Sequence, residues 1–298
     1  MKKLLLFAFA ITTILCFVSC GTNNSSQEND VSTDKLKQAI DSVSSINSLY
    51  YVTTYEEILK ADTGITTTIR TTENKSMKDP FVMWTKGSSQ INAESKQTGE
   101  TYIKTTGNGF EFAVRLKGAT EWQKSTPNDD QAQTQILINY YESFIKASCY
   151  LLSANLDSFK IDDNQDGIIK YSGTISQSSV VETYKQCLRD IFIDTNLIPS
   201  DKEIPDDLLK EITSGKIPEL MVGIPSLAFS DKPIPVTVWV NEKSNTITKV
   251  EIDKINVIQA LFDKNIMGKK GEVTKVEKAV LTYKVIEINT FDEIPMPQ

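Results

Sequence analysis

The chain has 298 residues and a net charge of −7, with 32 Lys and Arg against 39 Asp and Glu. This acidic balance argues against nucleic acid as a partner and against electrostatic docking on anionic lipid, because both need basic surfaces. The sequence contains no histidine, which excludes Ser-His-Asp and Cys-His nucleophile systems, most zinc hydrolase sites and the usual proton shuttle of neutral pH.

The first residues have the pattern of a secretory signal. Lys2 and Lys3 precede an apolar run from Leu4 to Val18, and the small Ser19 stands directly before Cys20. A cationic start, an apolar middle and a small residue at the cut are typical of a signal peptide. The run is shorter than the roughly 20 residues that a helix needs to cross a bilayer.

The segment Phe17-Val18-Ser19-Cys20 resembles the lipobox of bacterial lipoproteins, although Phe17 stands where leucine is usual. The resemblance implies that residues 1–19 are a lipoprotein signal peptide and that Cys20 carries a diacylglycerol, with palmitate-like chains as the membrane anchor. A plain cleaved signal and an uncleaved anchor are the alternatives. Cleavage removes two lysines and no acid, which takes the net charge from −7 to −9. We therefore expect anchoring through the acyl chains, at about 0.8 kcal/mol per buried CH₂, on the extracytoplasmic face of the cell membrane.

Residues 20–32 are polar and predict a flexible tether. A helix is expected to follow, because Leu36, Ile40, Val43 and Ile46 recur at helical spacing before Asn47. The region after it is rich in Thr, Tyr, Val, Ile and Phe, which predicts strands. We expect these strands at 49–60, 64–74, 80–94, 99–106, 109–117 and 119–125, with turns at 62–64, 78–80 and 107–109.

The second half of the chain predicts helices first and strands last. A helix from Asn128 to Ala154 is apolar over most of its girth, which indicates burial on several sides. Ser179-Val180-Val181-Glu182 fits a capping box and predicts a second helix. A hairpin lies between the two helices. The expected elements are the hairpin strands 159–162 and 168–175, a proline-rich lid or flap at 198–233, and final strands at 234–241, 245–260 and 272–288.

Cys149 and Cys187 are the two cysteines beyond the expected lipidation site. They suit either one disulfide in an extracytoplasmic space or two small core side chains. Cys187 lies on the apolar stripe of its expected helix, which favours the core.

This order of elements, with the late hairpin from Val236 to Val250, resembles the LolA/LolB-like lipoprotein carrier superfamily, in particular its LppX/LprG-like and Gram-positive members. The resemblance covers residues 33–298. It implies one α+β domain, a strongly curved antiparallel half-barrel sheet with helices packed in its concave face. It also implies an apolar cavity for acyl chains or a similar ligand.

The aromatic side chains are the candidates for lining such a pocket, with plain core packing as the alternative. They are Trp84, Tyr102, Phe112, Trp122, Tyr140, Tyr141, Phe144 and Trp239. The expected function is a membrane-anchored extracytoplasmic lipoprotein that binds a lipid or another apolar ligand. The alternative is a protein-interaction or envelope-sensor lipoprotein with a filled core. An enzyme is least favoured, since two Ser-x-x-Lys matches, at 32–35 and 143–146, lack the partner motifs of penicillin-binding enzymes.

One acidic loop has partial metal-ligand spacing. Asp162, Asn164 and Asp166 precede Gly167 as in the first half of an EF-hand loop, but Gly173 stands where a bidentate glutamate is required. Strands, rather than helices, are expected on both sides. A polar hairpin turn is the preferred interpretation and weak calcium binding is the alternative, so no cofactor is expected beyond the diacylglycerol.

Overall fold

A computed structural model describes residues 33–106, 109–116, 118–125, 147–194, 224–267 and 273–296. The expected signal peptide, Cys20 and the tether lie outside these residues, as do residues 128–146 of the expected long helix and residues 198–223 of the expected lid. Within the described residues, no helix has the length and apolar character that crossing a membrane requires.

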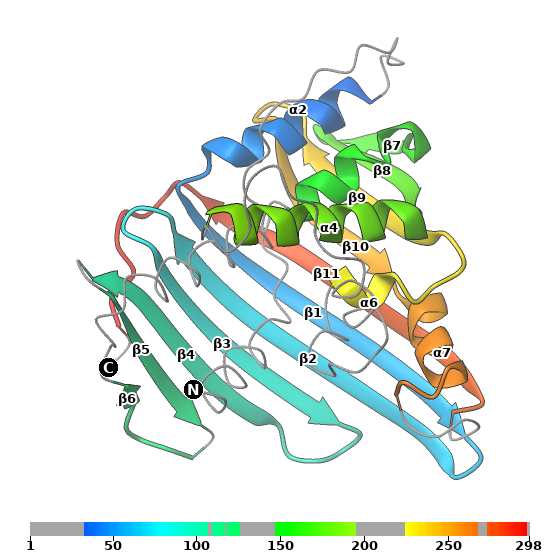
Figure 1. Ribbon diagram of the computed structural model, residues 1–298, viewed down its shortest axis with the longest axis horizontal. Coiled ribbons are helices and arrows are strands. Elements are labelled where there is room, and N and C mark those ends of the chain that lie inside the picture. The colour runs from blue at the N-terminus through cyan, green and yellow to red at the C-terminus, as the bar shows by residue number, and fades with distance from the viewer. Residues whose placement is uncertain are drawn as a thin grey trace.

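The described chain is dominated by one open sheet of eleven strands (Figure 1). Its spatial order is β6-β5-β4-β3-β2-β1-β11-β10-β9-β8-β7, and every neighbouring pair is antiparallel. The strands are β1 Ser48–Ala61, β2 Gly64–Met77, β3 Val82–Ile91, β4 Gln97–Thr106, β5 Gly109–Leu116, β6 Gln123–Ser125, β7 Lys160–Gln165, β8 Ile168–Ile175, β9 Ile234–Asn241, β10 Thr246–Asp253 and β11 Lys275–Ile288.

The pairing of β1 with β11 joins the two ends of the chain into this sheet. Leu49 lies opposite Ile288 at one end of the ladder and Lys60 lies opposite Lys275 at the other. β2 to β6 therefore lie on one side of this pair and β7 to β10 on the other.

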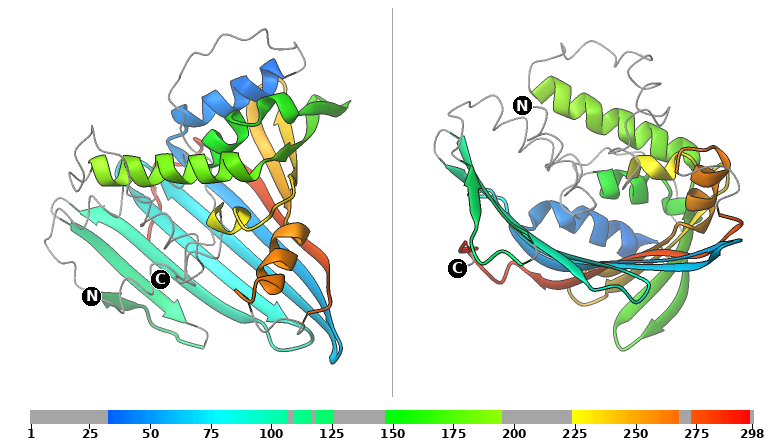
Figure 2. Two further views of the ribbon diagram at one scale, coloured as in Figure 1. Left: turned by 45° about the vertical axis from the view of Figure 1, so that its right-hand side comes forward. Right: turned by 90° about the horizontal axis from the view of Figure 1, so that it is seen from below.

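The helices are few and lie on one side of the sheet, which we call the helix face (Figure 2). They are α2 Asp34–Ser42, α4 Gln177–Asp194, α6 Ile224–Leu227, α7 Ile255–Asp263 and the short 3₁₀ turns Val43–Ser45 and Leu156–Ser158; residues 147–153 are also helical. α2 buries Leu36 and Ile40 against β9 and β10, and α7 packs on β11. Side chains alternate between sheet faces, and the core beneath the helices is formed by the inward residues of β8 to β11, such as Val236, Val238 and Val240.

The C-terminal tail crosses the opposite side, which we call the tail face. Phe291 and Ile294 pack on a small cluster that includes Val82 and Tyr102. The Tyr102 hydroxyl donates a hydrogen bond of 3.1 Å to the carbonyl oxygen of Ile294. The tail therefore covers apolar side chains of β2 to β5 that would otherwise face water.

Tyr102→Phe is expected to lower the free energy of unfolding by about 1 kcal/mol, because it removes this buried hydrogen bond and leaves the Ile294 carbonyl without its donor. Urea denaturation measures the loss. Tyr50→Phe is the matched control, since the Tyr50 hydroxyl lies 3.5 Å from Glu73 Oε2 at the limit of a hydrogen bond. Equal effects of the two substitutions would show that the tail is not fastened through Tyr102.

The predicted fold class is wrong. A strongly curved half-barrel with helices packed in its concave face was expected, but a large open sheet with edge strands β6 and β7 dominates the described residues. The reason is that the hairpin β7–β8, expected as a separate element, extends the same ladder through the pairing of Ile175 with Ile234. In the described part of the chain, helix contacts with the sheet concentrate on β8 to β11.

Two expected elements also differ in extent. The strand predicted over 245–260 ends at Asp253, and α7 follows from Ile255. The helix predicted from a capping box at Ser179 begins earlier, at Gln177. Its cap is the Ser176 hydroxyl, which accepts a hydrogen bond of 3.1 Å from the Ser179 backbone N–H.

Candidate functional site

The aromatic residues predicted to line a pocket lie in separate places. Trp84, Tyr102 and Trp122 belong to the cluster under the C-terminal tail. Phe112 lies on the helix face, where it packs with Phe81, Met83 and Ile103. Trp239 is on the tail face, with the Lys249 ammonium 4.1 Å from its ring centroid. Tyr140, Tyr141 and Phe144 lie outside the described residues. The described candidates thus do not line one common space.

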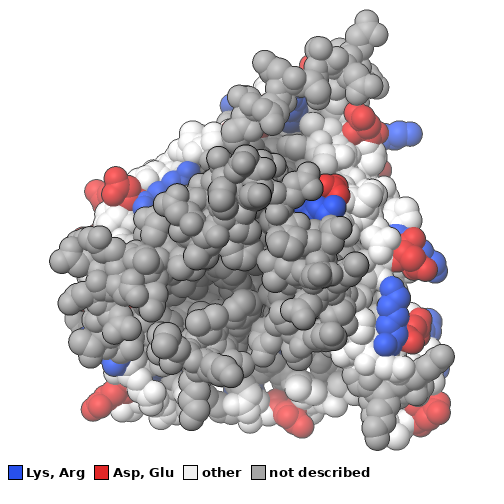
Figure 3. Space-filling view, in the orientation of Figure 1, with Lys and Arg blue, Asp and Glu red and all other residues white. Residues whose placement is uncertain are grey.

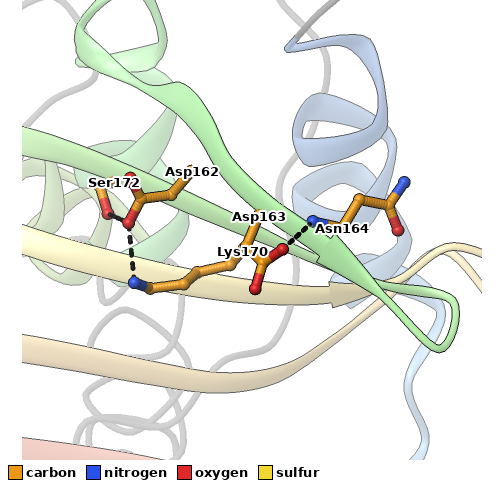
Figure 4. A network of polar contacts seen from close by, with 5 residues as sticks. All are labelled: Asp162, Asp163, Asn164, Lys170 and Ser172. Atoms are coloured by element: carbon orange, nitrogen blue, oxygen red, sulfur yellow. Dashed lines mark hydrogen bonds and ion pairs between the residues drawn. The ribbon is translucent and has the colours of Figure 1, made fainter.

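The acidic loop forms the hairpin between β7 and β8 (Figure 4). Asp162 Oδ2 accepts hydrogen bonds from Lys170 Nζ at 2.7 Å and from Ser172 Oγ at 3.0 Å, and both contacts lower the pKa of Asp162. Asp166 and Gly167 both have positive φ, as a two-residue hairpin turn requires. The loop thus has the structure of a polar hairpin, and the described residues contain no group of three or more Cys, Asp or Glu side chains placed to hold a metal ion.

The two cysteines lie in the core. Cys149, in the helical residues 147–153, and Cys187, on α4, are both buried in the core, and neither forms a disulfide. Of the two alternatives left open by the sequence, core packing is therefore the one observed.

The helix face changes character along the sheet. Over β8 to β11 its buried side chains are almost all apolar. Over β1 to β4 and at the end of β10 it carries buried polar side chains, which we call the polar strip. The strip consists of Thr53, Glu57, Thr68, Asn74, Thr85, Thr101 and Lys254.

Hydrogen bonds within the described residues satisfy only part of the polar strip. Thr85 donates to Asn74 at 3.1 Å, and Asn74 donates to the Thr72 carbonyl oxygen at 3.3 Å. The Thr101 hydroxyl is fully buried and has no hydrogen-bond partner in this part of the chain. Buried polar groups are nearly always hydrogen-bonded, because desolvation without a partner costs on the order of 1–3 kcal/mol. The strip therefore contains hydrogen-bonding groups that its own side chains do not satisfy.

The charged end of the strip joins three strands. The Lys254 N–H donates to the Ala279 carbonyl oxygen at 2.6 Å, and Ala279 lies opposite Glu57 in the ladder. Tyr55 lies opposite Arg70 on the same face. We call Tyr55, Glu57, Arg70 and Lys254 the charged cluster. Its members extend from Lys254, which is 5% exposed, to Arg70, which is exposed, so one end of the cluster meets water.

Within the charged cluster, Glu57 has a hydrogen-bond partner, whereas the Lys254 ammonium has none among the described residues. The Tyr55 hydroxyl donates to Glu57 Oε2 at 2.5 Å. The Lys254 ammonium lies 5.8 Å from the centroid of the Tyr55 ring. Among the described residues, it has neither a hydrogen bond nor an ion pair. It is thus the cation of a buried residue, and it faces an aromatic ring.

Burial controls the protonation of this cluster. Burial lowers the pKa of Lys254 to about 8, with Arg70 acting in the same direction and Glu57 against it. Burial and the Glu57 carboxylate both raise the pKa of Tyr55. At neutral pH the tyrosine is therefore a hydrogen-bond donor and most of the lysine is still protonated.

The sequence held a signal for this cluster that was missed. Lys254 follows Val250 and Ile252 at intervals of two, so it continues the apolar face of its strand. Glu57 follows Thr53 and Tyr55 in the same way. A charge in the buried register of a strand is unusual enough to mark a site.

Elsewhere on this side of the molecule, acidic and basic side chains are interspersed. Figure 3 shows them next to one another around the described rim. One exposed pair is Lys185 with Glu182 on α4, at 2.9 Å. The charged cluster is therefore distinguished by its burial rather than by a surrounding field of one sign.

No protein-family model matches the chain, and no curated protein matches it. What this site does must therefore be argued from its own residues.

Proposed function

We propose that the chain is a lipid-anchored protein of the extracytoplasmic membrane face that binds a lipid, or another ligand with an apolar body, against the helix face of its sheet. One observation carries the proposal. On the helix face, a buried polar strip whose hydrogen-bonding groups are only partly used lies beside an apolar half that packs under the helices. An amphiphile offers the same two kinds of surface.

The sequence supports binding rather than catalysis. The chain has no histidine, which excludes the Ser-His-Asp and Cys-His nucleophile systems, and burial together with Glu57 raises the pKa of Tyr55, so its hydroxyl stays protonated. The resemblance to LolA/LolB-like carriers enters the proposal through the ligand class alone, because the shape that it implies is wrong for this chain.

The ligand is tested on full-length protein taken from membranes in mild detergent. Native mass spectrometry is expected to show an added mass that organic solvent removes, and lipid analysis of the extract identifies it. A protein that carries no such mass and also fails to bind a fluorescent fatty acid would contradict the proposal. It would instead favour a protein-interaction role with a filled core.

The anchor has its own test, in which Cys20→Ser is expected to move the protein from the membrane fraction to the soluble fraction. Two or more acyl chains hold a protein firmly at a bilayer, whereas the acidic chain offers no electrostatic substitute. Cys16→Ser is the matched control, because Cys16 lies inside the apolar run. If the Cys20→Ser protein still sediments with membranes after a salt wash, acyl anchoring is wrong.

A further inference from the structure

Lys254 is the one member of the polar strip that carries a positive charge. It stands between β10 and α7, and the residue is 5% exposed. A buried ammonium without acceptors is costly, because it loses water and gains no hydrogen bond. In natural proteins buried charges are paired or serve a site.

The neighbouring groups do not neutralise Lys254. Glu57 is the one carboxylate that acts on it, and no carboxylate oxygen lies within ion-pair distance of the ammonium among the described residues. Glu57 already accepts the Tyr55 hydroxyl at 2.5 Å. Arg70 adds a second positive charge on the same face. The cluster therefore holds two cations and one anion, and the hydrogen bond that Glu57 accepts comes from Tyr55 and not from the ammonium.

We propose that the charged cluster binds the anionic headgroup, a carboxylate or a phosphate, of an amphiphile on the helix face, with Lys254 as the buried contact and Arg70 as the contact at the water-exposed end. This inference rests on the proposed function, because it names the headgroup of that ligand. An oxyanion supplies the acceptors that the ammonium lacks. A guanidinium matches carboxylate and phosphate oxygens in pairs.

The protonation state of Lys254 is compatible with binding an anionic headgroup. With a pKa of about 8, most Lys254 side chains carry a proton at neutral pH. A bound anion would raise that pKa further, since a nearby opposite charge favours the charged form. Arg70 stays charged at any pH the protein meets. Headgroup binding should therefore weaken when the pH is raised above 8.

Binding of matched probes to the full-length protein in detergent tests the inference. The probes share one chain length and differ in headgroup: dodecanoic acid, dodecyl phosphate and methyl dodecanoate. The wild-type protein is expected to bind at least one of the two anions about tenfold or more tightly than the uncharged ester, the size of one charge-assisted contact. Preference for the acid points to a fatty acid, and preference for the phosphate points to a phospholipid.

Two variants test whether Lys254 causes the preference for the anionic probes. Lys254→Met is expected to lose the preference for the anion and to keep its affinity for the ester. Lys249→Met is the matched control, because Lys249 is on β10, the strand directly before Lys254, but faces Trp239 and Glu251 on the tail face, and it should behave as wild type. Equal wild-type affinity for acid and ester, or a preference that survives Lys254→Met, would overturn the inference while leaving the proposed function intact. Failure of the wild-type protein to bind any of the three probes would overturn both.

Discussion

Gly173→Ala is expected to lower the free energy of unfolding by about 2–3 kcal/mol, the range of overpacking in a close-packed core. Gly173 lies in the middle of β8, opposite Val236 of β9. A Cβ atom at this position would stand 2.7 Å from both Cγ and Cδ1 of the Phe159 ring. Phe159 is itself buried and fully packed among core side chains, so the ring cannot turn away without opening the core. Urea denaturation measures the loss.

Gly87→Ala is the control for this substitution. Gly87 also lies within a strand, and the nearest atom to its new Cβ is the Gly99 carbonyl oxygen at 4.0 Å, an ordinary contact. The alanine there should change stability by less than about 1 kcal/mol, because only backbone entropy differs. In a Phe159→Leu background the penalty at Gly173 should shrink, since the clashing ring is gone. Equal losses at Gly173 and Gly87 would contradict the close contact.

Local patterns predicted most strands but could not give their arrangement. β2, β5, β8 and β9 lie close to their expected positions because alternation of apolar and polar residues is a local property. The pairing of Leu49 with Ile288 joins residues far apart in the chain, and no local pattern encodes it. That pairing joins the two strand groups into one open sheet, and the β8–β9 pairing adds the hairpin β7–β8 to it. These long-range pairings are why the expected half-barrel was wrong.

The missed helix α7 has a different cause. Ile255, Val257 and Ile258 are β-branched residues, which favour strands on propensity, and they follow β10 with only Lys254 between. The burial of Val257, Ile258, Leu261 and Phe262 follows helical spacing. Here tertiary packing on β11 decided the structure against local propensity.

The candidate site could not be predicted from the sequence, for related reasons. Glu57 lies on β1, Arg70 on β2 and Lys254 between β10 and α7, and the β1–β11 pairing brings them together. The sequence alone directed attention to aromatic residues, whose faces depend on strand register. Trp84 and Tyr102 face the tail, whereas Phe112 faces the helices, because a shift of one residue changes the face.

Lys254→Met should raise the free energy of unfolding at pH 7 by about 2 kcal/mol, within the range seen when buried charges are replaced by apolar residues. The pKa of Lys254 falls from its ordinary 10.5 to about 8 in the folded protein, which corresponds to roughly 3 kcal/mol of destabilisation while the amine is charged in both states. Methionine keeps the length of the aliphatic stem and removes the charge. A stabilising substitution in a ligand site is the expected sign of a residue kept for binding rather than for folding.

The pH dependence separates this effect from simple repacking. Below pH 8 the amine is protonated in both the folded and the unfolded state. The buried charge therefore destabilises the wild-type protein by its full amount. Between pH 8 and 10.5 the folded state releases the proton and the unfolded state keeps it, so wild-type stability rises relative to the variant. The advantage of Lys254→Met should therefore be largest at pH 7 and fade by about pH 10. Lys249→Met, whose ammonium lies over the Trp239 ring on the other face, should show no such trend. An advantage that stays constant with pH would mean that the buried amine is not the cause, and a destabilised Lys254→Met protein would mean that the lysine serves the fold.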